Sequence, residues 1–157
     1  MDPQMAESFR RIPYGIYVLT AKQGTEPRAT IVSWVSQVSY DPPLLMVALR
    51  HNRQAVSAIR QGGFFSLSLL KIGQKAVVTQ LKNPASARAF LESPEATGKQ
   101  NAPFLKEALV SWDCRLFSVV EAGDHILFIG QVQAVSASSS GAALTTGDYG
   151  KTYIGQS

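Results

Sequence analysis

Residues 29–53, ATIVSWVSQVSYDPPLLMVALRHNR, form together with Arg28 the stretch that decides the predicted fold. Apolar and β-branched residues on both sides of Asp41-Pro42-Pro43 predict two strands that are joined at this turn. The polar residues 51–54 then open a helical pattern of apolar residues, for which Asn52 is the predicted N-cap. The stretch therefore predicts a strand pair that is followed directly by a helix start.

Small hydroxyl side chains are spread through the first of these strands, at Thr30, Ser33, Ser36 and Ser39. Because these side chains are short and polar, a planar ligand rich in hydrogen-bond acceptors could lie against them. Ordinary outward-facing strand residues would give the same pattern, so the residues alone leave both interpretations open. At the far end of the stretch, a helix start beside Arg53 suits a phosphate group.

The chain has 157 residues, about the size of one domain, so we expect residues 1–157 to form a single domain. Its net charge is +4, but the 15 basic residues are scattered, which argues against nucleic-acid binding. Cys114 is the only cysteine, so no intrachain disulfide can form and a cytoplasmic location is expected. No apolar run suits a signal peptide or reaches the ~20 residues of a membrane helix, so we expect no membrane association.

The rest of the chain predicts further strands and short helices. Residues 2–11 place Met5, Phe9 and Ile12 at helical spacing, which predicts an amphipathic helix packed on the core. The remaining expected elements are strands at 14–21 and 64–70, a helix at 71–81, a surface excursion at 83–103 with a short helix around 85–91, a hairpin of strands 109–120 and 125–135, and a flexible segment at 136–143.

The predicted fold class is mainly β. In the strand 109–120, Val110, Trp112, Cys114 and Leu116 alternate with Ser111, Asp113 and Arg115, which predicts one apolar face and one polar face. Six or so strands with only two or three short helices would leave exposed sheet edges, and closing the sheet into a barrel removes them. We therefore expect a β-barrel with short helices.

Three segments, in this order along the chain, resemble the flavin reductase-like, FMN-binding split-barrel family. They are PYGIYVLTAKQG at 13–24, SWVSQVSYDPPLLMVAL at 33–49 and AGDHILFIGQV at 122–132. The chain is similar to the flavin reductase components of two-component monooxygenases, the flavin reductase module of flavodiiron proteins, and flavoredoxin. The resemblance implies a Greek-key split β-barrel, a homodimer, and FMN or FAD as cofactor. It also implies electron transfer from NADH or NADPH to that flavin, and onward to a monooxygenase or a redox protein.

The resemblance also implies roles for individual residues. Asn52, Arg53 and Gln54 would hold the flavin phosphate, and His125 would lie beside the flavin, near where the nicotinamide stacks. The isoalloxazine and ribityl chain would be lined by Thr30, Ser33, Trp34, Val35 and Ser36. Two positions depart from the family pattern, since Arg28 and Ala29 stand where many members have a glycine, and Gln54 and Ala55 replace a serine or threonine in the phosphate turn.

For several candidate site residues, a purely structural role is an alternative to a role in flavin binding. Trp34 could fill the core or a dimer interface, and His125 could simply cap a strand. Lys82 could reach the flavin phosphate or the N1/O2 edge of the ring, or be an exposed lysine, and Tyr149 could cover the site from the tail. Cys114 is expected to be buried and inert. Two histidines without paired carboxylates predict no metal site.

The predicted function is an FMN-dependent NAD(P)H:flavin oxidoreductase, in which the cofactors carry the hydride chemistry and the protein positions their rings. The chain contains no G-x-S-x-G, H-E-x-x-H, P-loop or G-x-G-x-x-G motif. Two alternatives stay open. One is a flavoredoxin-type FMN electron-transfer protein that does not oxidise NAD(P)H directly, and the other is a flavin-free structural or interaction module.

Overall fold

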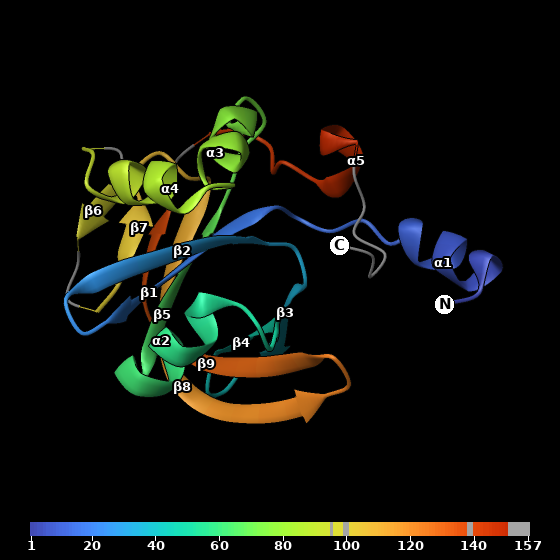
Figure 1. Cartoon of the computed structure of the whole chain (residues 1–157), viewed down its shortest axis with the longest axis horizontal. Coiled ribbons are helices and arrows are strands. Elements are labelled where there is room, and N and C mark those ends of the chain that lie inside the picture. The colour runs from blue at the N-terminus through green and yellow to red at the C-terminus, as the bar shows by residue number, and fades with distance from the viewer. Residues whose placement is uncertain (95, 99–100, 138–139, 151–157) are drawn as a thin grey trace.

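The computed structural model describes residues 1–94, 96–98, 101–137 and 140–150 (Figure 1). Seven antiparallel strands form one sheet in the order β2-β1-β5-β8-β9-β4-β3. In chain order these strands are β1 (Tyr17–Gln23), β2 (Glu26–Val32), β3 (Val35–Ser39), β4 (Leu44–Arg50), β5 (Phe64–Leu69), β8 (Val110–Ala122) and β9 (His125–Ala137). Two short strands, β6 (Ala96–Gly98) and β7 (Pro103–Leu105), pair with each other.

The two edge strands of the large sheet, β2 and β3, follow each other directly in the chain. Only Ser33 and Trp34 lie between them, and the Trp34 carbonyl accepts a hydrogen bond from the N–H of Ala48 in β4 at 3.0 Å. Because this connection is so short, the sheet must curl until its two edges approach each other. The prediction of a mainly β fold closed into a barrel is confirmed.

The organising stretch, residues 28–53, forms three strands where two were predicted. The first predicted strand breaks at Ser33 and Trp34, because the chain crosses there from one sheet edge to the other, whereas residues 41–43 join β3 to β4 as predicted. The helix α2 (Gln54–Gly62) follows. Its N-cap is Arg53 in an extended conformation and not Asn52 as predicted, and no side chain makes a cap hydrogen bond there.

The first hydrophobic core fills the barrel and the space beneath α2. Leu19, Val47 and Phe128 are fully buried in it, as is the ring of Phe65. Gly130 in β9 lies so close to that ring that a Cβ atom would sit 2.5 Å from its Cζ atom. A side chain at position 130 would therefore displace the ring, which ties this glycine to the packing of the barrel.

The second core lies at one end of the barrel, beneath α3 (Lys75–Gln80) and α4 (Pro84–Leu91) (Figure 1). The helix α4 begins after Asn83, whose side chain accepts a hydrogen bond from the N–H of Ser86 at 3.0 Å. It buries Phe90 and Leu91. The short helix predicted around 85–91 forms as α4, but the segment is not only a surface excursion, since Ala87, Phe90 and Leu91 are buried in this core.

The helix α1 (Pro3–Arg10) forms where the sequence predicts it, with the Asp2 carboxylate accepting hydrogen bonds from the first-turn N–H groups. It does not pack on the core as predicted. None of its residues is buried, and Met5, Phe9 and the following Ile12 are exposed. Figure 1 shows α1 extending away from the barrel, so its apolar face has no partner among the described residues.

Three other predicted elements differ in extent from those in the structure. The strand predicted at 14–21 begins at Tyr17, and the helix predicted at 71–81 shortens to α3 because Gly73 adopts a left-handed φ of 101°. The segment at 136–143 was predicted to be flexible, but part of it is bonded to the barrel. The Ala142 carbonyl accepts a hydrogen bond from the N–H of Ile72 at 2.9 Å. Residues 138–139 lie outside the described part of the chain.

The predicted hairpin of β8 and β9 forms, but β8 extends to Ala122, so that only residues 123–124 remain in the turn and Ala122 pairs with His125. The register between β8 and β9 shifts twice, and the shift at Phe117 adds an unpaired residue to β8 that interrupts the predicted alternation of its faces. Ser111, predicted on the polar face, is buried and donates a hydrogen bond to the Ser68 hydroxyl at 2.8 Å, whereas Cys114 is buried as predicted. No helix in the described part of the chain is both long enough and apolar enough to cross a membrane.

Candidate functional site

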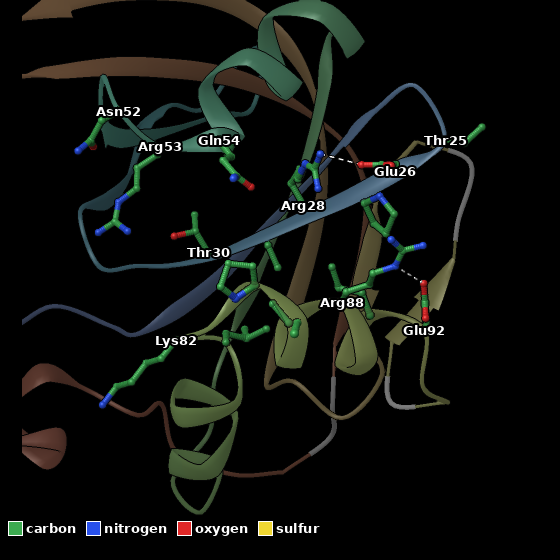
Figure 2. Close-up of a pocket in the computed structure, with 18 residues that line it drawn as sticks. Thr25, Glu26, Arg28, Thr30, Asn52, Arg53, Gln54, Lys82, Arg88 and Glu92 are labelled. Atoms are coloured by element: carbon green, nitrogen blue, oxygen red, sulfur yellow. Dashed lines mark hydrogen bonds and ion pairs between the residues drawn. The ribbon is translucent and has the colours of Figure 1, made fainter.

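A pocket of about 670 Å³ opens between β2, the start of α2 and the helix α4 (Figure 2). Five of the predicted site residues line it: Thr30, Asn52, Arg53, Gln54 and Lys82. Thr30 belongs to β2, whereas the other four come from the start of α2 and from the turn before α4. The predicted grouping of this strand with the helix start is therefore present in the fold.

The start of α2 leaves hydrogen-bond donors available at this pocket. The N–H of Val56 donates to the Arg53 carbonyl at 3.0 Å, but the N–H groups of Gln54 and Ala55 have no hydrogen-bond partner among the described residues, and no side chain caps them. Arg53 stands at the N-cap position and lines the pocket beside them. An anion bound at this point would satisfy free donors and would also lie at the positive end of the helix dipole.

The charges around the pocket also favour an anionic ligand. Four basic side chains line it against only two acidic ones, Glu26 and Glu92. Arg28 pairs with Glu26 at 2.7 Å, and Arg88 pairs with Glu92 at 2.9 Å. Arg53 and Lys82 form no ion pair with any described residue, so the pocket holds two cations that a ligand can neutralise.

Arg28, which lines this pocket, has a buried donor that finds no partner among the described residues. The Nε atom of Arg28 is buried and makes no hydrogen bond, although the same guanidinium is bonded to Glu26 through another nitrogen. A buried donor left without an acceptor costs free energy, and an acceptor atom of a ligand would remove that cost.

A second cluster of candidate residues joins Trp34 to His125. Their ring centroids are 4.6 Å apart, and the ring of Tyr14 lies 6.5 Å from Trp34. The His125 side chain is 14% exposed, and its Nδ1 lies 2.6 Å from a carboxylate oxygen of Asp124. Because the carboxylate can only accept, Nδ1 carries the proton in this bond, which orients the ring and lowers the pKa of Asp124.

The Trp34–His125 cluster lies next to the part of the pocket that Arg53 lines. His125 pairs directly with Arg50 at the end of β4, and Arg53 follows only three residues later. His51 reaches towards the tip of the β8–β9 hairpin, with its Nε2 3.4 Å from the Gly123 carbonyl and 3.6 Å from Glu121. Glu121 also pairs with Arg60 of α2 at 2.8 Å. These contacts fasten the hairpin that carries His125 to the helix that follows Arg53.

The other predicted site residues are placed differently. Ser33 is buried in the connection between β2 and β3, and Ser36 is exposed, with its hydroxyl donating to the carbonyl of Gln37. Val35 packs partly against the barrel core. Tyr149 lies in α5 (Thr146–Tyr149), where it packs against the second core. The lining of the described pocket includes none of these residues, nor Trp34 or His125.

Two arginines line the pocket without having been predicted to do so. Arg28 was noted only as a departure from the family pattern, and Arg88 lies in the segment that was predicted to be a surface excursion. The sequence feature that singled out Arg28 was its position, where many members of the family have a glycine. No comparable signal exists for Arg88, because its position depends on how α4 packs over β2. The described residues contain no group of three or more metal-ligating side chains.

The family model described as "Flavin reductase like domain" matches residues 9–153. Diflavin flavoprotein A 1 of Synechocystis sp. (strain PCC 6803) is 32% identical over 135 residues, which are 84% of this chain and 24% of that protein. A probable flavin reductase of Rhizobium meliloti is 28% identical over 151 residues, which are 94% of this chain and 48% of that protein.

The solved structure of BorF, the flavin reductase component of a bacterial two-component tryptophan halogenase, has a TM-score of 0.82 with this chain. The two are 26% identical, and the match covers 92% of each. The chain thus spans about a quarter to a half of the two curated relatives but nearly all of this structure. The resemblance seen in the three sequence segments is confirmed. The chain belongs to the flavin reductase-like domain family and has its split β-barrel fold.

Proposed function

We propose that this protein is an FMN-binding flavin reductase that transfers electrons from NADH or NADPH to flavin. The observation that carries the proposal is the shared pocket, in which Thr30 of β2 meets the uncapped helix start at Arg53. The family supports flavin reduction in general. The proposal goes further in naming FMN as the flavin and NADH or NADPH as the electron donor.

The residues present fit FMN. Arg53 and the N–H groups at the start of α2 would hold its phosphate, and Thr30 would contact the ribityl chain. The ring would lie beside the Trp34–His125 pair, with Asp124 keeping the His125 ring in one orientation. When bound, FMN supplies the hydride-accepting ring, so the protein needs no nucleophile or acid–base pair of its own.

Assembly and partners belong to the proposal as well. Exposed apolar side chains on α1 and on the outer part of β8, including Phe9, Phe117 and Val120, support a homodimer, because a monomer gains nothing by exposing them. BorF is named as the reductase component of a halogenase system, which supports a monooxygenase or a redox protein as electron acceptor. The absence of any intrachain disulfide supports a cytoplasmic location.

The direct test is to follow NADH and NADPH oxidation at 340 nm with purified protein and added FMN. The proposal predicts turnover well above the rate of free FMN with the reduced nucleotide. His125→Ala is expected to lower the turnover number while FMN binding is largely kept, because in the proposed arrangement His125 would contact the ring and not the phosphate. No turnover with either nucleotide would remove the enzymatic claim.

A second candidate function is a flavoredoxin-type electron-transfer protein that does not oxidise NAD(P)H itself. It is favoured by the similarity to a diflavin flavoprotein in which this chain corresponds to only 24% of the length. In such an arrangement a neighbouring domain could supply the electrons. A protein that binds FMN tightly, ignores both pyridine nucleotides, and is reduced by a protein donor would support this candidate over the first.

A further inference from the structure

Arg50, the last residue of β4, is a partly exposed cation beside the Trp34–His125 cluster. It pairs directly with His125 across the ladder of β4 and β9. The next pair of the ladder, Leu49 and Ile126, is buried in the barrel core. Because successive side chains of a strand point to opposite faces, Arg50 and His125 share the outer face of the sheet. Residues paired in this way have Cβ atoms about 4.5–5.5 Å apart, so the two side chains start as close neighbours.

The charge of Arg50 is not neutralised within the part of the chain that the structure describes. Its guanidinium forms no ion pair there, and the nearby Asp124 carboxylate is bonded instead to Nδ1 of His125 at 2.6 Å. The pKa of Asp124 is lowered first by this hydrogen bond and also by the positive charge of Arg50. The guanidinium is therefore near enough to the cluster to act on a charge that develops there.

Arg50 and Arg53 occupy the two ends of one turn. The N–H of Arg53 donates to the Arg50 carbonyl at 3.1 Å, and such a turn brings the two Cα atoms to within about 7 Å. Arg53 lines the pocket to which the flavin phosphate is assigned, whereas the lining does not include Arg50. The turn thus carries one cation at the phosphate pocket and a second cation at the Trp34–His125 pair.

We propose that Arg50 is a further cofactor contact, whose positive charge stabilises the negative charge that the flavin ring carries after reduction. The inference rests on the proposed function, because it takes the ring to lie beside the Trp34–His125 pair. Hydride transfer from NADH or NADPH brings two electrons and one proton to the ring, oxidises the nucleotide, and leaves the ring with one more negative charge.

The position of Arg50 suits this role. Because its side chain is partly buried, its charge is screened less than that of a cation on the open surface. A fixed positive charge at the ring favours the reduced flavin over the oxidised flavin, which is one way in which a protein tunes a redox cofactor. A contact with the phosphate would favour both forms equally, because the phosphate keeps its charge on reduction.

The experiment measures dissociation constants of oxidised and reduced FMN without oxygen, and the two-electron potential of the bound flavin. Arg50→Gln should weaken reduced FMN about tenfold more than oxidised FMN, the factor expected for one charge-assisted contact. That ratio corresponds to a potential about 30 mV lower than in the wild type. Arg50→Lys keeps the charge and should restore most of the potential. Because the potential is read from flavin-bound protein, it reports on the ring even if the variant is less stable.

Arg115→Gln is the matched control. Arg115 is exposed on β8, forms no ion pair in the described ranges, and pairs with Gln131 of β9. Gln131 lies six residues along β9 from His125, which is roughly 20 Å at the usual rise of a strand. Removing this arginine changes the net charge as much as Arg50→Gln does, and it should leave the potential unchanged.

Three other results are informative. Equal weakening of oxidised and reduced FMN by Arg50→Gln, with an unchanged potential, would overturn the inference while leaving the flavin reductase proposal intact. Weaker binding of FMN but not of riboflavin, again at an unchanged potential, would also overturn it, because Arg50 would then contact the phosphate. A wild-type protein that binds no flavin would instead overturn the proposed function.

Discussion

Arg53 is the residue at which the pocket meets the start of α2. It forms no ion pair with the described residues, and its position at an uncapped helix start is unfavourable for a cation that has no anionic ligand. We expect Arg53→Ala to weaken FMN about tenfold or more, because a charge-assisted contact to the phosphate is lost. Riboflavin, which lacks the phosphate, should lose almost nothing.

Fluorescence titration with both flavins checks this prediction, with Arg10→Ala as a charge-matched control far from the pocket. Equal losses of FMN and riboflavin affinity would mean that Arg53 acts on the pocket as a whole and that the phosphate is held elsewhere. The comparison of two ligands matters here because a destabilised pocket would weaken both of them, whereas the loss of a phosphate contact affects only one.

Cys114 offers a second test at the scale of one residue. Burial in the barrel core, with a smaller contribution from Asp113, raises the pKa of its thiol from 9.0 to about 12. At pH 8 the thiolate fraction is then about a thousandfold lower in the folded than in the unfolded protein, so iodoacetamide should modify the native chain far more slowly. Similar rates with and without guanidinium chloride would show that Cys114 is accessible.

The same pKa difference has a consequence for stability. Above pH 9 the unfolded chain releases the thiol proton and the folded protein retains it, so the unfolded state binds fewer protons. The free energy of unfolding that this group contributes is therefore intact below about pH 9 and is lost as the pH rises towards 12. Between pH 8 and pH 10, the free energy of unfolding should fall more for the wild type than for Cys114→Ala. Denaturant titrations of both proteins at the two pH values measure this.

At the scale of elements, the contact between β9 and β5 depends on Gly130. A Cβ atom at this position would lie 2.5 Å from the ring of Phe65 and 2.8 Å from the Cβ atom of Cys114, and both neighbours are fully buried. We expect Gly130→Ala to lower the free energy of unfolding by about 1–3 kcal/mol, because the core has no room to shift without strain.

Gly147→Ala is the matched control for this substitution, since among the described residues its added Cβ would meet only the Thr145 hydroxyl, at an ordinary 3.5 Å. Urea titrations of both variants give the comparison. Equal stability of the two would show that the barrel can accommodate the added methyl group and that Gly130 is not needed for packing.

The elements that the sequence predicts well are those whose pattern is local. The β8–β9 hairpin, the turn at residues 41–43 and the Asp2-capped α1 follow from turn residues and short-range periodicity. The break of the first predicted strand at Ser33 and Trp34 does not, because it is imposed by closure of the barrel between strands distant in the sheet. The burial of α4 likewise depends on what lies beneath it, which its own residues do not specify.

The site residues likewise fall into those that the sequence predicts and those whose position depends on the assembled barrel. Thr30 and residues 52–54 were predicted together from a resemblance in sequence, and they line one pocket. The predicted cap at Asn52 is one residue too early, because the helix begins only after the extended Arg53. The positions of Arg28 and Arg88 at the pocket depend on how closely β2 and α4 approach, which is a property of the assembled barrel. The departure from the family's glycine singled out Arg28 but did not predict this position.

At the scale of the whole molecule, the exposed apolar face of α1 supports the proposed homodimer. Its apolar residues Met5 and Phe9 are exposed and contribute nothing to either core. We expect Phe9→Ser to leave the melting temperature of the isolated subunit unchanged and to weaken the proposed homodimer, which analytical ultracentrifugation over a range of concentrations can measure. Glu7→Ser, a polar substitution on the same helix, is the control. An unchanged dimer, or a destabilised subunit, would contradict this role for α1.

The central claim is that the pocket between β2 and the start of α2 binds the flavin phosphate while the ring reaches the Trp34–His125 pair. The most direct measurement is a crystal structure of the protein with FMN. The account predicts phosphate oxygens within hydrogen-bond distance of Arg53 and of the first N–H groups of α2, with the isoalloxazine beside His125. FMN bound at another surface, or with its phosphate turned away from Arg53, would contradict it.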